Sequence, residues 1–330
     1  MSSDWSSDVC SSDLAARPRL ERELNLIDAK GFSGYFLVVW DIVGHARRQG
    51  LAVAGRGSGA SSLVAYILGI TNVCPLTYDI PFERFLNERR EDFPDLAIDF
   101  CWRVRDEIID YAFRRWGTDR AAMVCTHNTF QAASAVREAA KAFGYSDDQI
   151  SRFDERSLRG DLAYIARAGQ RLAGLPHHLS VHPGGIVLGR KPIDHYVPIQ
   201  RAPKGVMITQ YDKDGVEDAG LVKLDLLGNR SLSTIRFACD LVRERTGRAI
   251  DVESLPPGDP ATFELLRAAD TVGCNQLESP AMRHLLKAMR PGNVRGLMQA
   301  LALIRPGAAS VGRPLDGDPD ADKLIGMKEV

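Results

Sequence analysis

The sequence predicts an α+β protein with an acidic site on its sheet, from two strand-like runs and the helical patterns around them. The run 94–100 alternates apolar residues with Asp95, Ala97 and Asp99, which is typical of a strand with one buried face. A second run, 221–228, has the same character and contributes another acid. Buried acids are costly unless a cation meets them, so these carboxylates are candidate functional groups.

Composition sets limits on the kind of protein. The chain has 330 residues, 45% of them hydrophobic and 26% charged, as in an ordinary globular protein of two domains or more. The net charge of −1 gives no overall positive field, so any binding of nucleic acid requires local patches. The six cysteines form no C-x-x-C pair, which argues against a zinc ribbon or a disulfide scaffold and favours a reducing cytoplasm. No apolar run reaches the roughly 18 residues of a membrane span.

The amino terminus is expected to lie outside the fold. Residues 1–14 repeat Ser-Ser-Asp three times and have neither the basic start nor the apolar core of a signal peptide. They read as translated sequencing-adapter sequence, with a native flexible tail as the alternative. Helices are then predicted over 18–30 and 35–48.

A glycine-rich loop follows a short strand at 51–54 and precedes a helix predicted over 61–68. Strand, glycine loop and helix together form a context in which backbone N–H groups receive an anion. The guanidinium of Arg56 and the hydroxyls of Ser58 and Ser61 would add side-chain donors. The loop is neither a Walker A motif nor a dinucleotide fingerprint, and a tight structural turn is the alternative. The predicted phosphate-binding residues are Gly55, Arg56, Gly57, Ser58, Gly59 and Ser61.

The remaining patterns are mainly helical. Strands are predicted at 124–126 and 186–188; helices are predicted at 103–116, from 131 to about 173, and after 229, 259 and 276. Three histidines fall within 176–185, but no acid or cysteine lies at ligand spacing, so a Pro-Gly-Gly turn is preferred to a metal site. The arginines of 81–90 either face phosphates or pair with neighbouring glutamates.

Several blocks, in this order, resemble the α subunit of bacterial DNA polymerase III, the C family of DNA polymerases. The matching stretches are Gly31–Phe36, Gly55–Ser62, Phe82–Arg89, Pro94–Phe100, His182–Val187, Gln210–Lys213, Ala219–Gly228, Gln276–Ser279 and Ala302–Gly307. The His-Leu-Ser-x-His-Pro-Gly-Gly block and Asp99–Arg103 favour the error-prone branch.

The resemblance implies a nucleotidyltransferase-type, polymerase β-like palm with a mixed sheet, a helical thumb inserted in it, and the start of helical fingers. By that map the palm covers 15–129 and 186–230, the thumb 130–185, and truncated fingers 231–330. The chain would be a central fragment without a 3′–5′ exonuclease. Its regions for the sliding clamp and for replisome or translesion subunits would lie elsewhere.

The resemblance also implies two Mg²⁺ ions held by three aspartates, two of which match Asp99 and Asp225. Ala97 stands where the third is expected, either as a genuine substitution or as a sequencing error. Asp95 cannot replace it, because residues four apart on a strand are about 13 Å apart, whereas two such metals lie about 4 Å apart. Lys223, two residues before Asp225, is expected to share its face and to help hold phosphate.

Three functions are compatible with these patterns. The leading hypothesis is a fragment of a DNA-directed DNA polymerase that adds dNTPs to the 3′-hydroxyl of a primer on template DNA. The second is a non-catalytic homologue that retains binding of DNA or nucleotide, and Ala97 distinguishes the two. A nucleotidyltransferase acting on another acceptor would have neither the helical insert at 130–185 nor the Gln276–Ser279 and Arg305–Gly307 blocks.

Overall fold

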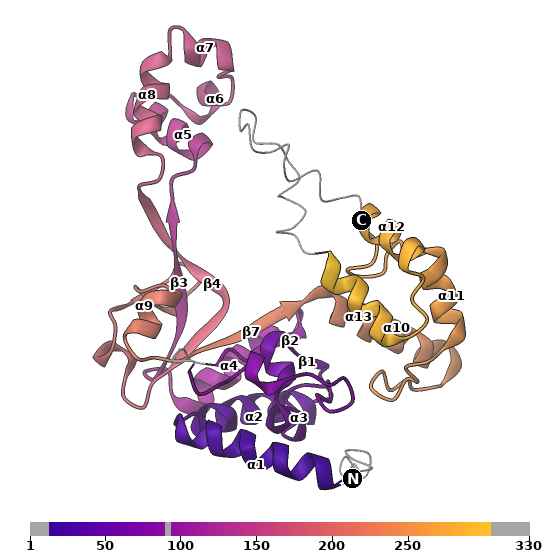
Figure 1. Cartoon of the computed structure of the whole chain (residues 1–330). Helices are drawn as coiled ribbons and strands as arrows, with labels where there is room; N and C mark the ends of the chain where they lie inside the picture. The colour runs from indigo at the N-terminus through magenta and orange to yellow at the C-terminus, as the bar shows by residue number, and fades with distance from the viewer. Residues whose placement is uncertain (1–12, 90–93, 305–330) are drawn as a thin grey trace. The chain divides into compact units, whose positions relative to one another are not determined.

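The computed structural model describes residues 13–89 and 94–304, and its centre is one mixed sheet of seven strands (Figure 1). The strand order is β1-β2-β7-β4-β3-β6-β5, with β2–β7 and β3–β6 parallel and the other pairs antiparallel. The strands are β1 Val53–Arg56, β2 Ala97–Cys101, β3 Ala121–Thr129, β4 Pro176–Leu188, β5 Ile199–Arg201, β6 Met207–Thr209 and β7 Lys223–Asn229. The α+β class with a mixed sheet is therefore confirmed.

Helices precede, interrupt and follow the sheet. Those before β4 are α1 Asp13–Ala29, α2 Ser33–Arg48, α3 Leu63–Ile67, α4 Arg105–Trp116, α5 Ala132–Ala142, α6 Asp147–Ile150, α7 Glu155–Arg159 and α8 Ala163–Leu172. Those after β4 are α9 Lys213–Asp218, α10 Arg230–Thr246, α11 Pro260–Ala268, α12 Pro280–Met289 and α13 Val294–Leu303. Short 3₁₀ turns occupy Gly57–Ser61, Phe82–Arg84 and Ile193–His195. None of the helices in the described ranges is long and apolar enough to cross a bilayer.

The main core lies on one face of the sheet. Ile98 of β2 and Leu224 of β7 belong to the same buried cluster as Ile42 of α2 and Ile108 of α4. Because side chains alternate along a strand, Asp99 and Asp225 must point to the opposite face. The apolar alternation thus fixes which face carries the acids.

The structure corrects several boundaries predicted from the sequence. α1 begins at Asp13, so two residues of the predicted 1–14 tail belong to a helix, whereas 1–12 and the Arg305–Gly307 block lie outside the described residues. The strands predicted at 124–126 and 186–188 are parts of the longer strands β3 and β4, which pair with each other. The apolar pattern of the sequence underestimates the length of both strands, because polar residues interrupt this pattern in one half of each strand.

The predicted Pro-Gly-Gly turn is also wrong, because Pro183, Gly184 and Gly185 lie within β4. A Cβ atom on Gly184 would lie 2.5 Å from the carbonyl oxygen of Leu226, so glycine lets the backbone of β4 approach β7. Gly184 therefore serves strand packing, and β4 is irregular rather than reversed here, because its register against β3 shifts between Val181 and Ile186.

Helices α5–α8 connect β3 to β4 and have a small core of their own. Ile165, Ala139 and Ala140 are its fully buried members. In Figure 1 these helices lie beyond the far ends of β3 and β4. The chain divides into two compact units, Met1–Phe237 and Ala238–Val330, which we call unit 1 and unit 2. In unit 2, α11–α13 enclose a separate apolar cluster that includes Phe263, Met282 and Leu286.

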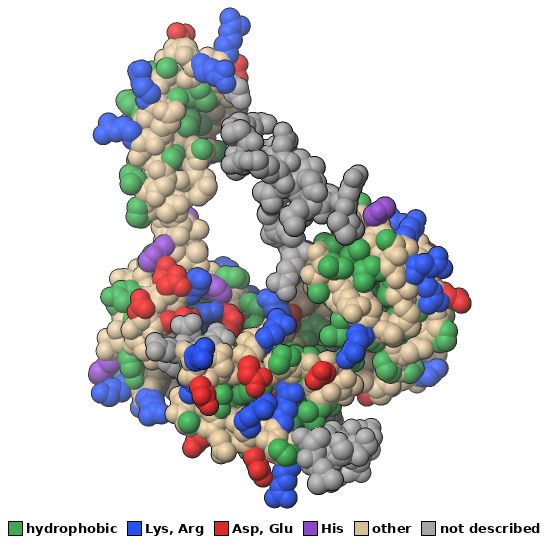
Figure 2. Space-filling view, viewed as in Figure 1, with side chains coloured by type: hydrophobic (Ala, Val, Ile, Leu, Met, Phe, Trp, Pro, Cys, Tyr) green, Lys and Arg blue, Asp and Glu red, His purple; other side chains and the backbone are tan. Residues whose placement is uncertain are grey.

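Basic and acidic side chains intermix over the visible face of unit 1 (Figure 2), in keeping with the net charge of −1. This face has no broad field of one sign.

Candidate active site on the sheet

The register of three neighbouring strands brings the candidate residues together. Ala97 of β2 is the Cα partner of Asp225 on β7 and of Arg56 on β1. Asp99, two residues further along β2, shares the face of Ala97. Ala97 therefore lies between a carboxylate on one side and a guanidinium on the other, with Asp99 next along the strand.

Both carboxylate oxygens of Asp99 are engaged. Asp99 is buried, with only 6% of its surface exposed. Oδ1 lies 3.4 Å from Nε of Arg56, and Oδ2 accepts a hydrogen bond of 2.8 Å from the amide of Asn229. The Oδ1 atom of Asn229 in turn accepts from the backbone N–H of Ser231 in the first turn of α10. Asn229 thus holds Asp99 and the start of α10 in one arrangement, a role that no sequence pattern indicated.

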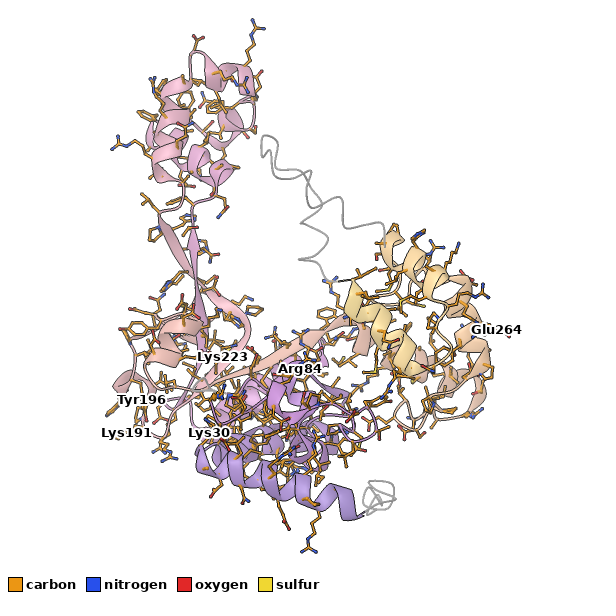
Figure 3. The ribbon with its side chains drawn as sticks, viewed as in Figure 1. Lys30, Arg84, Lys191, Tyr196, Lys223 and Glu264 are labelled. Carbon is orange, nitrogen blue, oxygen red and sulfur yellow. The ribbon has the colours of Figure 1, made fainter. Side chains whose placement is uncertain are left out.

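Asp225 has one engaged and one unengaged oxygen. Lys223 donates to Oδ2 at 2.5 Å, so the predicted same-face ion pair is present; Figure 3 labels Lys223 in unit 1. Oδ1 is buried and has no hydrogen-bond partner among residues 13–89 and 94–304. A buried carboxylate oxygen without a partner is costly, and a bound cation would remove that cost.

Two further titratable groups lie in the electrostatic reach of this ion pair. The Nδ1 atom of His182 accepts from the backbone N–H of Gly185 at 2.6 Å. Burial lowers the pKa of His182, although the charge of Asp225 acts in the opposite direction. Burial also raises the pKa of Glu217, against the effect of Lys223. The sequence interpretation had placed neither residue at the site.

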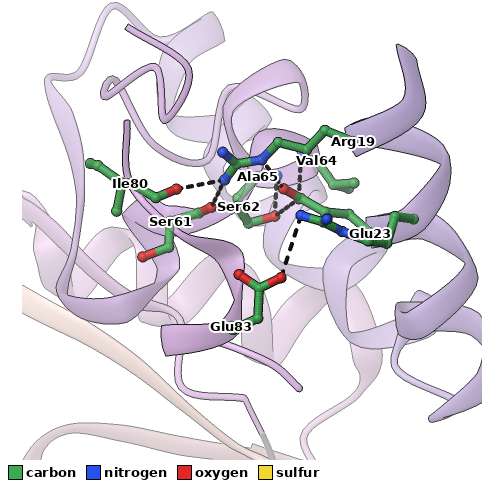
Figure 4. A network of polar contacts seen from close by, with 9 residues as sticks. Arg19, Glu23, Ser61, Ser62, Val64, Ala65, Ile80 and Glu83 are labelled. Atoms are coloured by element: carbon green, nitrogen blue, oxygen red, sulfur yellow. Dashed lines mark hydrogen bonds and ion pairs between the residues drawn. The ribbon is translucent and has the colours of Figure 1, made fainter. Parts of the chain in front are cut away.

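A carboxylate of the protein itself occupies the start of the helix that follows the glycine loop. The helix after the loop begins at Leu63, not at 61, and Glu23 of α1 reaches its first turn (Figure 4). The Oε2 atom of Glu23 accepts from the hydroxyl of Ser62 at 3.0 Å and from the N–H of Val64 at 3.2 Å. The amino terminus of α3 is thereby satisfied within the protein.

Arg19 completes this network from the preceding turn of α1. It pairs with Glu23 at 2.9 Å and donates to the carbonyl oxygens of Ser61 and Ile80 at 2.7 and 2.8 Å (Figure 4). Ser61 itself is buried. The loop side chains that remain open to a ligand are those of Arg56, which is exposed, and Ser58, which is half-buried.

Some glycines of the loop are explained by packing. A Cβ atom on Gly55 would lie 2.5 Å from the carbonyl oxygen of Ile70, and one on Gly59 would lie 2.5 Å from the side chain of Leu96. Gly57 has a φ of +71°, which disfavours other residues. The tight-turn alternative therefore accounts for these three glycines, and it leaves Arg56 and Ser58 as the candidate phosphate donors.

Two family models cover nearly the whole chain. The Bacterial DNA polymerase III alpha NTPase domain matches residues 10–162 and 156–228, and the Bacterial DNA polymerase III alpha subunit finger domain matches residues 231–314. The chain belongs to the bacterial DNA polymerase III α family. The resemblance inferred from the sequence blocks is confirmed.

Curated relatives of this polymerase family carry two kinds of name. The error-prone DNA polymerases of Symbiobacterium thermophilum and Pseudomonas fluorescens are 40% and 39% identical to the chain, over 95% and 88% of it. The DNA polymerase III subunit alpha of Bacillus subtilis is 37% identical over 92% of the chain. In each case the match covers 30% of the relative, so the chain spans about a third of the length of these proteins.

DNA polymerases of this kind imply divalent metal ions, generally Mg²⁺, and the chain fits such ions only in part. The unpartnered Oδ1 of Asp225 suits a cation. Asp99 has both oxygens engaged, Ala97 has no ligand atom, and Asp95 is exposed ahead of β2. Within residues 13–89 and 94–304, no group of three or more His, Cys, Asp or Glu side chains is arranged to hold a metal. The residues present do not fit two ions.

Proposed function

We propose that this chain is the portion of a DNA-directed DNA polymerase that carries the nucleotidyl-transfer site, with Asp99 and Asp225 as its catalytic carboxylates. The observation that carries the proposal is the parallel register of β2 and β7, which sets both acids on one face beside Arg56. Membership of the DNA polymerase III α family supplies the reaction class: addition of a dNTP to the 3′-hydroxyl of a primer.

The domain assignment follows from the same proposal. The palm comprises 15–129 and 186–230, because all seven strands except the first part of β4 fall in these ranges. The thumb is 130–185, where α5–α8 have a core of their own. The fingers begin at 231, close to the division between the two compact units.

In this proposal the triphosphate of the incoming dNTP lies against Arg56 and Ser58, with Gly55, Gly57, Gly59 and Ser61 shaping the loop. Arg56 already faces Asp99, so it can contact phosphate and carboxylate from one position. Lys223 pairs with Asp225 and adds positive charge next to the phosphates. Asp99 and Asp225 are the residues that would hold Mg²⁺, and by themselves they do not fit the two ions that this chemistry uses.

Ala97 limits what this chain can catalyse. A carboxylate at 97 would be the cross-strand neighbour of Asp225 and two residues from Asp99, which is the position that could serve both. Without it the site has two acids, one of them already engaged by Arg56 and Asn229. We therefore expect weak metal binding and little or no primer extension, while DNA and nucleotide still bind.

The test compares primer extension by the full-length protein with alanine at 97 and with Ala97→Asp. Removing one preorganised electrostatic contact to the transition state typically costs about 10²–10³ in kcat, so Ala97→Asp is expected to raise the extension rate by about that factor. Equal rates for the two proteins would mean that another carboxylate serves and that the ligand assignment is wrong. Extension by neither, with DNA binding retained, would favour a non-catalytic homologue.

The partners and location belong to the same proposal. Primer-template DNA and dNTPs are its substrates, and contacts with a sliding clamp and with replisome or translesion subunits would be made by parts of the protein beyond this chain. The reducing cytoplasm inferred from the scattered cysteines is where such a polymerase would act.

A further inference from the structure

A cavity of about 380 Å³ lies beside the acidic site, at the ends of β2 and β7 where both strands lead into helices. Its lining includes Arg56, Arg105 and Arg230, with Asp99 as the acid, and the indole of Trp102. Three guanidinium groups against one carboxylate give the cavity an excess of positive charge. Its volume is within the range of pockets that hold small ligands.

Little acidic charge inside the cavity balances Arg105 and Arg230. The Nε atom of Arg105 lies 3.2 Å from Oδ1 of Asp106, a sequence neighbour whose side chain is largely exposed, and it makes no hydrogen bond to the described residues. Within the described ranges the charged group of Arg230 has an aromatic contact, 5.8 Å from the ring of Trp102, and no carboxylate within 4 Å. Guanidinium groups held this way are available to an anion.

Trp102 is 49% exposed although it follows directly on the buried end of β2. An indole left open beside guanidinium groups is the arrangement by which proteins hold a base and its phosphate without reading sequence. Gly228 forms another wall: a Cβ atom there would lie 3.3 Å from Trp102 and 3.8 Å from Nε of Arg105. The missing side chain keeps this part of the cavity open.

We propose that this cavity binds one nucleotide of a single DNA strand, with its base against Trp102 and its phosphate against Arg105 and Arg230. A strand nucleotide is favoured over a free dNTP because the cavity combines an exposed indole with the guanidinium group of Arg230 over its ring, whereas the predicted triphosphate site is on the glycine loop. The inference deepens the proposed function and rests on it, since the strand would belong to the primer-template DNA.

Binding of a fluorescein-labelled, mixed-sequence single-stranded decamer to the full chain tests the site. Trp102→Ala is expected to weaken binding roughly 5- to 150-fold, the range for loss of one stacked base, with little change in its salt dependence. Trp102→Phe should recover most of the loss. Arg230→Ala should weaken binding and reduce the slope of log affinity against log salt by about 0.7.

Matched controls separate the site from general effects. Trp40→Ala removes another tryptophan, 47% exposed, on α2, and Arg236→Ala removes an exposed arginine further along α10; both should bind as the unchanged chain does. Gly228→Ala alters no charge and should weaken binding by filling the cavity. Circular dichroism spectra and thermal melts verify folding.

Equal affinity for the decamer in the Trp102, Arg230 and Gly228 variants would overturn the inference, even if Ala97→Asp restores primer extension. Loss of dATP binding in these variants without loss of decamer binding would overturn the assignment to a strand. If the Trp102, Arg230 and Gly228 variants lose decamer binding while Ala97→Asp fails to extend a primer, the strand site is supported. In that case only the proposed polymerase activity is contradicted.

Discussion

Replacing Glu23 by alanine is expected to lower the free energy of unfolding of unit 1 by about 3–5 kcal/mol, the cost of breaking a buried ion pair. Glu23 is 0% exposed and accepts three contacts of 2.9–3.2 Å, from Arg19, Ser62 and Val64. Its removal leaves the guanidinium of Arg19 without its counter-charge and the backbone N–H of Val64 without its acceptor. Hydrogen bonds to charged groups contribute about 1.5–3 kcal/mol each, so the loss of the two bonds from Ser62 and Val64 is by itself enough for a cost of about 3–5 kcal/mol.

Urea unfolding followed by tryptophan fluorescence measures the change in unit 1. Trp40, Trp102 and Trp116 lie in the described part of unit 1, and unit 2 has no tryptophan, so its unfolding contributes little to the signal. Glu21→Ala is the matched control, because Glu21 pairs with Arg17 on the same helix at the same spacing but in solvent. It should cost no more than about 0.5 kcal/mol.

The reasoning would be refuted if Glu23→Ala and Glu21→Ala destabilised unit 1 equally. The double variant Glu23→Ala, Arg19→Met then isolates the ion pair. It should be more stable than Glu23→Ala alone, because the uncompensated charge of Arg19 is gone.

Three further predictions use the same unfolding assay. Gly184→Ala should cost about 1–3 kcal/mol by forcing β4 away from the backbone of β7. Gly34→Ala is the control, because a Cβ atom there meets no atom within 4 Å and Gly34 has no positive φ; a loss at 184 no larger than at 34 would contradict the close approach. Lys223→Met should cost about 3–5 kcal/mol because it leaves Asp225 buried without a cation, whereas Lys213→Met, in an exposed ion pair, should change stability little. Weaker binding of dATP by the folded Lys223→Met protein would support the phosphate role. Unchanged binding would show that Lys223 is only a structural partner of Asp225. Burial lowers the pKa of His45, which stacks on Tyr111, so the unfolded state binds more protons at this residue than the folded state. The free energy of unfolding should therefore fall as the pH drops through about 6.5, by less than about 1.4 kcal/mol per pH unit. His45→Gln should reduce this slope, and an unchanged slope would exclude His45 as its source.

The sequence by itself determined the local features of the site. Alternation of apolar and polar residues identified the strands around Asp99 and Asp225, because a strand with one buried face imposes a period of two. The same period placed Lys223 beside Asp225, and the structure has that ion pair. The ordered blocks of residues identified the family, which the family models confirm.

Tertiary structure decided which groups meet across the chain. Glu23 reaches Ser62, 39 residues away, and Asn229 reaches Asp99, 130 residues away. No local pattern identifies either partner, because the first contact depends on how α1 packs and the second on the pairing of β2 with β7. The pairing of Ala97 with Arg56 and Asp225 likewise depends on strand register, and the course of β4 through Pro183–Gly185 depends on its approach to β7. From local propensity, residues such as Asn229 and Gly184 are predicted to lie in turns or at the surface. Their actual positions are stabilised by contacts with residues distant in sequence.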